Sequence, residues 1–220
     1  MIVKLYTYWR SQASFRVRIA LRMKGLTAEA VALDLIKGDQ FDPRYRALNP
    51  EMVVPTLIDD GPPLVQSLAI IEYLDEKYPE PPLLPADLRG RAHVRALAQT
   101  VAVDAHPFIV PRVRKYLDEE LGLDEAARTN WVRHWLDGAS RVLEEALACD
   151  PRSGRFCCGD AVTIADICLA AHFASAALFG AREAAAFPTA GRIFAACMAL
   201  PAFAQEHPLR QPDAQAEAPV

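Results

Sequence analysis

The chain has 220 residues, of which 52% are hydrophobic and 24% are charged, so it can bury a core and is not a disordered polypeptide. No apolar run reaches the roughly 18 residues of a membrane span, and the first residues lack a basic flank and a cleavage site, so we expect no signal peptide. The net charge of −4 argues against broad electrostatic binding to nucleic acid or to an anionic membrane.

The N-terminal part of the chain alternates between strand and helix patterns. β-branched and aromatic residues over 2–8 predict a strand. The four-residue spacing of Phe15, Ile19 and Met23 predicts a helix that ends at Gly25. The elements expected next are a strand at 30–35, a helix at 41–48, a proline-containing strand at 53–58, a return strand at 64–65 and a helix at 67–78. This order, βαβαββα, predicts an α/β domain.

The remainder of the chain has helical patterns only. Alanine, the best helix former, is concentrated between 161 and 200. The expected helices are 88–121 with interruptions at Pro107 and Pro111, 124–149, about 164–178, and 189–200. The expected organisation is an α/β domain over 1–80, a proline-rich linker over 81–87, an all-α domain over 88–210 and a flexible tail over 211–220.

All five cysteines lie in the C-terminal half of the chain. Cys157 and Cys158 are adjacent and poorly placed to pair with each other. No Cys/His spacing is typical of zinc, so we expect no metal site. The pattern predicts buried, reduced thiols in a cytoplasmic protein.

Several strings in the sequence are distinctive. Residues 8–21 read YWRSQASFRVRIAL, and further strings are ALNP at 47–50, VVPTL at 53–57, QSLAIIEYL at 66–74 and RQPD at 210–213. Residues 8–21 resemble the zeta-class signature of glutathione transferases, where a Ser-Ser-Cys segment precedes an aromatic residue and then Arg-Val-Arg-Ile-Ala-Leu. The other strings agree with that class, so the resemblance covers nearly the whole chain.

This resemblance has clear implications for fold and function. The class includes maleylacetoacetate and maleylpyruvate isomerases, enzymes of aromatic amino acid catabolism. It implies the glutathione transferase fold, in which a thioredoxin-like N-terminal domain binds glutathione as cofactor. An all-α C-terminal domain then shapes the site for a small electrophilic substrate. The family architecture also implies a homodimer.

The start of the first helix suits a thiolate on physical grounds as well. Ser11 lies between a strand and a helix, where free N–H groups and the helix dipole favour an anion. A hydroxyl that donates to a thiolate lowers the thiol pKa, and the thiolate is the nucleophile. We therefore take Ser11 and Ser14 as candidate catalytic residues, and Ser11 and Gln12 as glutathione contacts. The alternative is that both serines only cap the helix.

The other glutathione contacts are implied by the resemblance. A cis bond before Pro55 would present the Val54 backbone to an extended peptide; the alternative is a trans proline in an edge strand. Gln66 and Ser67 open the next helix and suit the γ-glutamyl carboxylate, although Ser67 alternatively serves only as an N-cap. Gln40 lies in the loop that reaches the glycyl end in this family, or is simply solvated.

The candidate substrate residues lie in the second domain. His106 and Arg112 match a bacterial isomerase segment, whereas its paired Asn positions hold Ile109 and Val110. Leu178 stands where the isomerases carry an Arg that binds a substrate carboxylate. We take His106, Val110, Arg112 and Leu178 as substrate-binding candidates. Alternatively, His106 is a capping or structural residue and Arg112 is a solvated helix charge.

These replacements bear on the reaction. An unpaired buried carboxylate costs several kcal/mol, so the site is more apolar than a dicarboxylate isomerase needs. Ala13 also replaces the signature Cys. We expect addition of a glutathione thiolate to an electrophilic carbon, in cis–trans isomerisation or in conjugation or dehalogenation. The alternative is a glutathione-binding module with little catalysis.

The capping pattern of Thr163 and Asp166 is interpreted as structural.

Overall fold

The computed structural model describes residues 3–214 and divides the chain into two units. The first unit comprises Met1–Pro82 together with Pro201–Val220, and the second comprises Leu83–Leu200. None of the helices in the described residues is long and apolar enough to cross a membrane.

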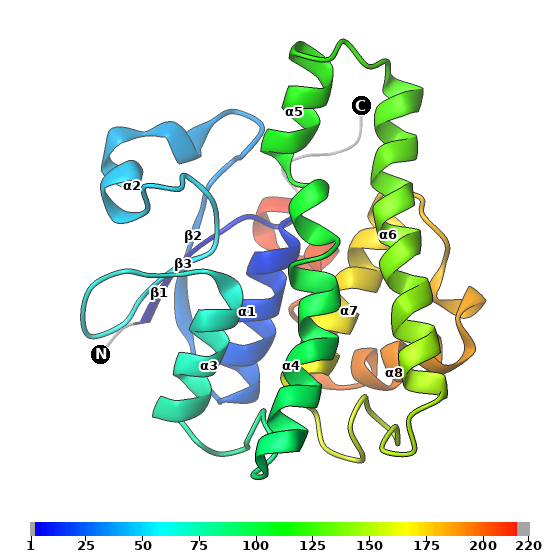
Figure 1. Ribbon diagram of the computed structural model, residues 1–220. Coiled ribbons are helices and arrows are strands. Elements are labelled where there is room, and N and C mark those ends of the chain that lie inside the picture. The colour runs from blue at the N-terminus through cyan, green and yellow to red at the C-terminus, as the bar shows by residue number, and fades with distance from the viewer. Residues whose placement is uncertain (1–2, 215–220) are drawn as a thin grey trace. The chain divides into compact units, whose positions relative to one another are not determined.

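The first unit is built on a four-stranded mixed sheet with strand order β2-β1-β3-β4 (Figure 1). Strand β1 (Val3–Thr7) pairs in parallel with β2 (Ala28–Ala32). On its other side it pairs antiparallel with β3 (Thr56–Ile58), which pairs antiparallel with β4 (Leu64–Val65). Burial alternates along β1, as expected for a strand with only one face in the core.

Three helices complete the first unit. Helices α1 (Gln12–Met23) and α3 (Ser67–Lys77) lie side by side on one face of the sheet, and α2 (Pro43–Leu48) lies on the other. Every residue of α1 from 12 to 21 is buried. A helix that is covered all round must find protein or ligand partners for its polar side chains.

The observed order β1-α1-β2-α2-β3-β4-α3 confirms the predicted thioredoxin-like fold class. Two strands differ from the prediction. Strand β2 begins and ends earlier than expected, since its register pairs Ala28 with Val3. Strand β3 begins only at Thr56, because Pro55 has no N–H to donate to a ladder.

The second unit is entirely helical in its regular elements. Its α-helices are α4 (Leu88–Ala102), α5 (Pro111–Glu119), α6 (Glu125–Ala148), α7 (Ile164–Leu178) and α8 (Pro188–Met198). Helix α7 is central: it packs against α4, α6 and α8, and residues 164–176 are all buried. Its many small alanines let the surrounding helices approach closely. The predicted capping box of Thr163 and Asp166 begins this helix.

The segment after α8 corrects the predicted domain boundaries. The helical domain was expected to extend to 210, but α9 (Pro201–Ala204) and the short turns Pro208–Arg210 and Pro212–Ala214 belong to the first unit. The physical reason is that Phe203 is fully buried and α9 packs against α1. Residues 215–220 of the predicted tail lie outside the described residues.

Candidate functional site

Ser11 is the N-cap of α1. Its backbone is extended, with φ −72° and ψ 115°, and its Oγ accepts a hydrogen bond from the Ser14 amide at 3.1 Å. The capping role is therefore present. It uses only an oxygen lone pair, so the hydroxyl hydrogen can still be donated to an anion at the helix N-terminus.

Three uncharged side chains of the first unit bury polar atoms that have no hydrogen-bond partner among residues 3–214. These atoms are Oε1 and Nε2 of Gln12, Oγ of Ser14 and Oε1 of Gln40. Gln12 is 4% exposed and Ser14 is fully buried. Each orphaned group costs about 1–3 kcal/mol. Because proteins rarely tolerate such groups without a purpose, their presence favours a polar ligand in this unit.

The Val54–Pro55 peptide bond is cis, as predicted from the sequence. Val54 is buried, yet within the described chain its backbone N–H and C=O make no hydrogen bond. The following residue, Thr56, is already paired with β1 and β4. An unpaired donor and acceptor beside the end of a strand are what an added peptide strand needs.

Asn49 anchors the loop in front of Pro55. Its Nδ2 donates to the Val53 carbonyl at 2.8 Å and to Thr56 Oγ1 at 3.0 Å, and its Oδ1 accepts from the Glu51 amide at 3.1 Å. Asn49 is fully buried. The conformation of this loop is thus set by a side chain from the ALNP string, several residues earlier in the chain.

Gln66 and Ser67 form the entry to α3. Gln66 has φ 70° and ψ 114°, a conformation that costs a non-glycine residue about 1–3 kcal/mol. Its Nε2 donates to Glu51 Oε2 at 2.8 Å, although the residue is exposed. The buried Ser67 Oγ accepts from Arg16 Nη1 at 3.1 Å. A guanidinium therefore stands beside a helix N-terminus, and both favour a carboxylate.

Arg16 is a residue that the sequence analysis missed as a site residue. It is 1% exposed although it lies in a charged Arg-Val-Arg string that is typical of a solvated helix face. No local signal marked it, because adjacent helix residues point about 100° apart and a core position at Phe15 does not place Arg16 in the core.

The substrate-side candidates of the second unit are spread over three elements. His106 begins the turn His106–Phe108 and is partly exposed, and Val110 is the N-cap of α5. Arg112 is exposed on α5 and makes no ion pair within the described residues. Leu178 is the last residue of α7 and is half-buried. No hydrogen bond or ion pair joins these four residues.

Ile109 does not face solvent but belongs to an apolar cluster. It is 4% exposed and packs with Val132, Leu136 and Ala176, and several aromatic side chains pack against this cluster. The Phe108 ring stacks on Trp135 with centroids 4.0 Å apart. The wall beside His106 and Val110 is thus aliphatic and aromatic.

Arg114 is the cation of α5 that contacts this cluster. Its guanidinium lies 5.1 Å from the centroid of the Phe179 ring. Arg112 and Arg114 are two residues apart, so an α-helix points them about 200° away from each other. The resemblance pointed to Arg112, the exposed member of this pair, and not to Arg114.

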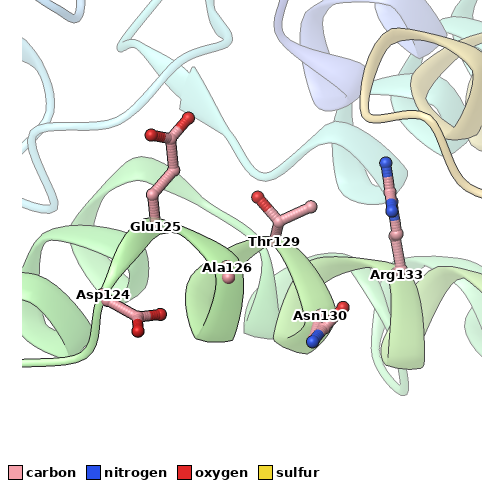
Figure 2. A pocket seen from close by; sticks show the side chains of 6 residues that line it. All are labelled: Asp124, Glu125, Ala126, Thr129, Asn130 and Arg133. Atoms are coloured by element: carbon pink, nitrogen blue, oxygen red, sulfur yellow. The ribbon is translucent and has the colours of Figure 1, made fainter.

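A surface hollow of the second unit contains none of the predicted site residues. The hollow lies at the start of α6 and has a volume of about 550 Å³. Figure 2 shows the side chains that line it, among them the acidic Asp124 and Glu125 and the basic Arg133. Asp124, which lines it, is already used to cap α6 through the Ala127 amide at 2.8 Å. Because the hollow contains no predicted site residue and no orphaned polar atom, we do not regard it as the functional site.

Two comparisons with known sequences identify the same family, one from the N-terminal part of the chain and one from nearly its full length. The glutathione S-transferase N-terminal domain family matches residues 5–82. A maleylpyruvate isomerase of Ralstonia sp. is 43% identical over 211 residues, which are 96% of this chain and 99% of that protein.

Solved structures are also similar over nearly the full length. A maleylacetoacetate isomerase from Methylobacterium extorquens AM1, solved with malonate and glutathione bound, is 49% identical with a TM-score of 0.93, covering 96% of this chain and 99% of that one. The enzyme from Anaeromyxobacter dehalogenans 2CP-1 was solved with dicarboxyethyl glutathione and citrate in its active site. It is 41% identical with a TM-score of 0.84 and 97% coverage of both chains.

Proposed function

From the premise that the chain belongs to the glutathione S-transferase family, with zeta-class isomerases among its relatives, we propose that it is a glutathione-dependent isomerase of a maleyl-type keto acid. When bound, glutathione supplies a thiolate that adds reversibly to the cis double bond of such a substrate. The chain itself belongs to an enzyme family, so catalysis is favoured over simple glutathione binding.

The observation that carries the proposal is the unused hydrogen-bonding capacity of the first unit. Glutathione is a peptide with two carboxylates, an amine and a thiol. The open backbone of Val54 suits its peptide groups, and the orphaned atoms of Gln12, Ser14 and Gln40 suit its polar ends. The residues present therefore fit this cofactor.

Each proposed contact has a separate task. Ser11 Oγ donates to the sulfur at the N-terminus of α1 and so keeps the proton off it. The amino end of α3, with Ser67 and the Arg16 guanidinium, holds the γ-glutamyl carboxylate. Gln40 binds towards the glycyl end. Together these contacts would orient the thiolate.

Ser11→Ala is the decisive test. Removing the single donor to the thiolate is expected to lower kcat about 100-fold, while glutathione affinity changes little because the other contacts remain. The pKa of the bound thiol should rise, measured by thiolate absorbance against pH. Ser14→Ala tests the competing residue by the same measurements. An Ser11→Ala variant with full activity would move the role to Ser14 or to the backbone.

A second reaction is favoured by the substrate-side wall. Ile109 is buried in an apolar cluster, and Val110 and Leu178 add only aliphatic groups. A dianionic substrate would be poorly compensated there. The second candidate function is therefore conjugation or dehalogenation of a neutral or monoanionic electrophile, which would replace the isomerase proposal if it is faster than isomerisation of a maleyl dicarboxylate. Side-by-side kcat/KM values that favour the dicarboxylate would exclude this.

Location and assembly follow from the same proposal. All five cysteines are free, and Cys149 is exposed, which suits the reducing cytoplasm. We infer a cytoplasmic homodimer, in keeping with the family architecture. Sedimentation of the purified chain would test the second part.

A further inference from the structure

The C-terminal segment of the first unit reaches back to the loop that carries Ser11. The Trp9 amide donates to Asp213 Oδ2 at 2.8 Å, although the two residues are 204 positions apart. Trp9 lies two residues before Ser11, between β1 and α1. Asp213 thus binds the backbone of the loop at its centre.

Arg18 holds the same loop from the other side. It is 5% exposed, and its Nη1 donates to Thr7 Oγ1 at 3.0 Å and to the Tyr8 carbonyl at 3.4 Å. Its Nη2 donates at 3.4 Å to the carbonyls of Trp9 and Glu206. The N–H of Trp9 is therefore held by Asp213, and its C=O by Arg18.

The hydrogen bonds continue from this pair to Ser11. The Ser11 amide donates to the Tyr8 carbonyl at 3.0 Å, the same oxygen that Arg18 contacts. A displacement of the Trp9 peptide would therefore be passed to the N-cap of α1.

The charges of this cluster compensate one another. Burial lowers the pKa of Arg18 to about 10, and the carboxylates of Glu206 and Asp213 oppose that effect. Arg18 thus remains charged at neutral pH. The Glu206 Oε2 lies 3.8 Å from Arg18 Nε. Glu206 and Asp213, both in the C-terminal segment, thus compensate the charge of the buried Arg18 guanidinium.

We propose that Asp213 is a positioning residue for the glutathione reaction. It holds the Trp9 amide and, with Arg18, fixes the loop of residues 8–11, so that the Ser11 hydroxyl is directed at the thiolate site. This inference rests on the proposed role of Ser11. Hydrogen bonds to a reacting atom lose strength steeply with misalignment, so a loosened loop would impair the reaction more than cofactor binding.

Asp213→Ala tests the inference in the full-length chain. We expect about a tenfold loss of kcat, because one donor is misaligned rather than removed. The glutathione Kd should change less than about threefold, and the pKa of the bound thiol should rise. Asp213→Asn should recover part of the activity, because its Oδ1 still accepts from Trp9. Leu209→Ala, at an exposed position of the same segment, is the control.

Two further measurements separate positioning from a general loss of structure. Amide hydrogen exchange at Trp9 should accelerate in Asp213→Ala and not in Leu209→Ala. The double variant Ser11→Ala/Asp213→Ala should have the thiol pKa of Ser11→Ala alone, because both act through one hydroxyl.

The outcomes are distinguishable. An unchanged Trp9 exchange rate, or faster exchange with an unchanged thiol pKa, overturns the positioning role. A raised thiol pKa in Asp213→Ala combined with none in Ser11→Ala supports the positioned loop but refutes the role proposed for Ser11.

Discussion

Two buried polar sites, one in each unit, differ in whether their polar atoms find partners within the chain. In the second unit, the buried Asp166 carboxylate accepts from the Cys157 amide at 2.7 Å and from the Thr163 amide and hydroxyl, each at 2.8 Å. In the first unit, Gln12 and Ser14 are equally buried but leave polar atoms unpaired. A group that serves the fold is satisfied within the chain, whereas a group that serves a ligand keeps its capacity open.

The largest effect is expected where the fold depends on a satisfied group. Asp166→Ala leaves three donors without an acceptor and removes half of the capping box, so the free energy of unfolding should fall by about 3 kcal/mol. Urea unfolding of the purified chain measures this. Asp104→Ala, at an exposed carboxylate of the same unit, should stay within about 0.5 kcal/mol of the parent. A loss below 1 kcal/mol for Asp166→Ala would mean that the contrast between the units is not energetic.

Replacing a buried polar group that has no partner should instead raise the free energy of unfolding. Gln12→Leu replaces a buried amide that has no partner by an apolar side chain of similar size, so the glutathione-free protein should become about 1 kcal/mol more stable. Glutathione affinity should fall about tenfold, since one hydrogen bond to the ligand is lost. Urea unfolding and calorimetric titration measure the two quantities.

Gln205→Leu is the matched control for this exchange, because Gln205 is an exposed glutamine of the same unit. It should alter neither quantity. A Gln12→Leu variant that is destabilised and still binds glutathione normally would show that the amide serves the fold, and the distinction between the units would then fail at this position.

In both units, sequence patterns predicted the features that depend on residues close together in the chain. The cap at Ser11, the capping box at Thr163 and the order of strands and helices each depend on residues a few positions apart. The cis bond before Pro55 was expected only from the resemblance, not from any spacing.

Contacts between distant segments were not predictable from periodicity. The Arg16–Ser67 bond spans 51 residues and the Trp9–Asp213 bond spans 204. The RQPD string at 210–213 agrees with the zeta class, but no local pattern connects Asp213 to Trp9, and the segment from 211 onward was therefore interpreted as a flexible tail. On the substrate side, helix geometry turned Arg112 outward and left Arg114 against Phe179.

The smallest expected effect is a pH dependence of the first unit. Burial lowers the pKa of His207, and the charges of Arg210 and Arg18 add to this. The folded pKa therefore lies below the unfolded value of about 6.5. The contribution of His207 to stability is complete above that value and is lost as the pH falls from it through the lower folded pKa, and partial solvent screening keeps this loss small.

His207→Gln removes the titration and should flatten the fall in unfolding free energy between about pH 7.5 and pH 5.5. The acid sensitivity of the two units can be compared in the same way, because burial also lowers the pKa of His93 in the second unit. The pH dependence of stability therefore has the same sign for both histidines. His93→Gln is therefore the matched variant. If only His93→Gln flattens the profile, acid sensitivity belongs to the second unit, and the C-terminal segment around His207 keeps its contacts with α1 in mild acid.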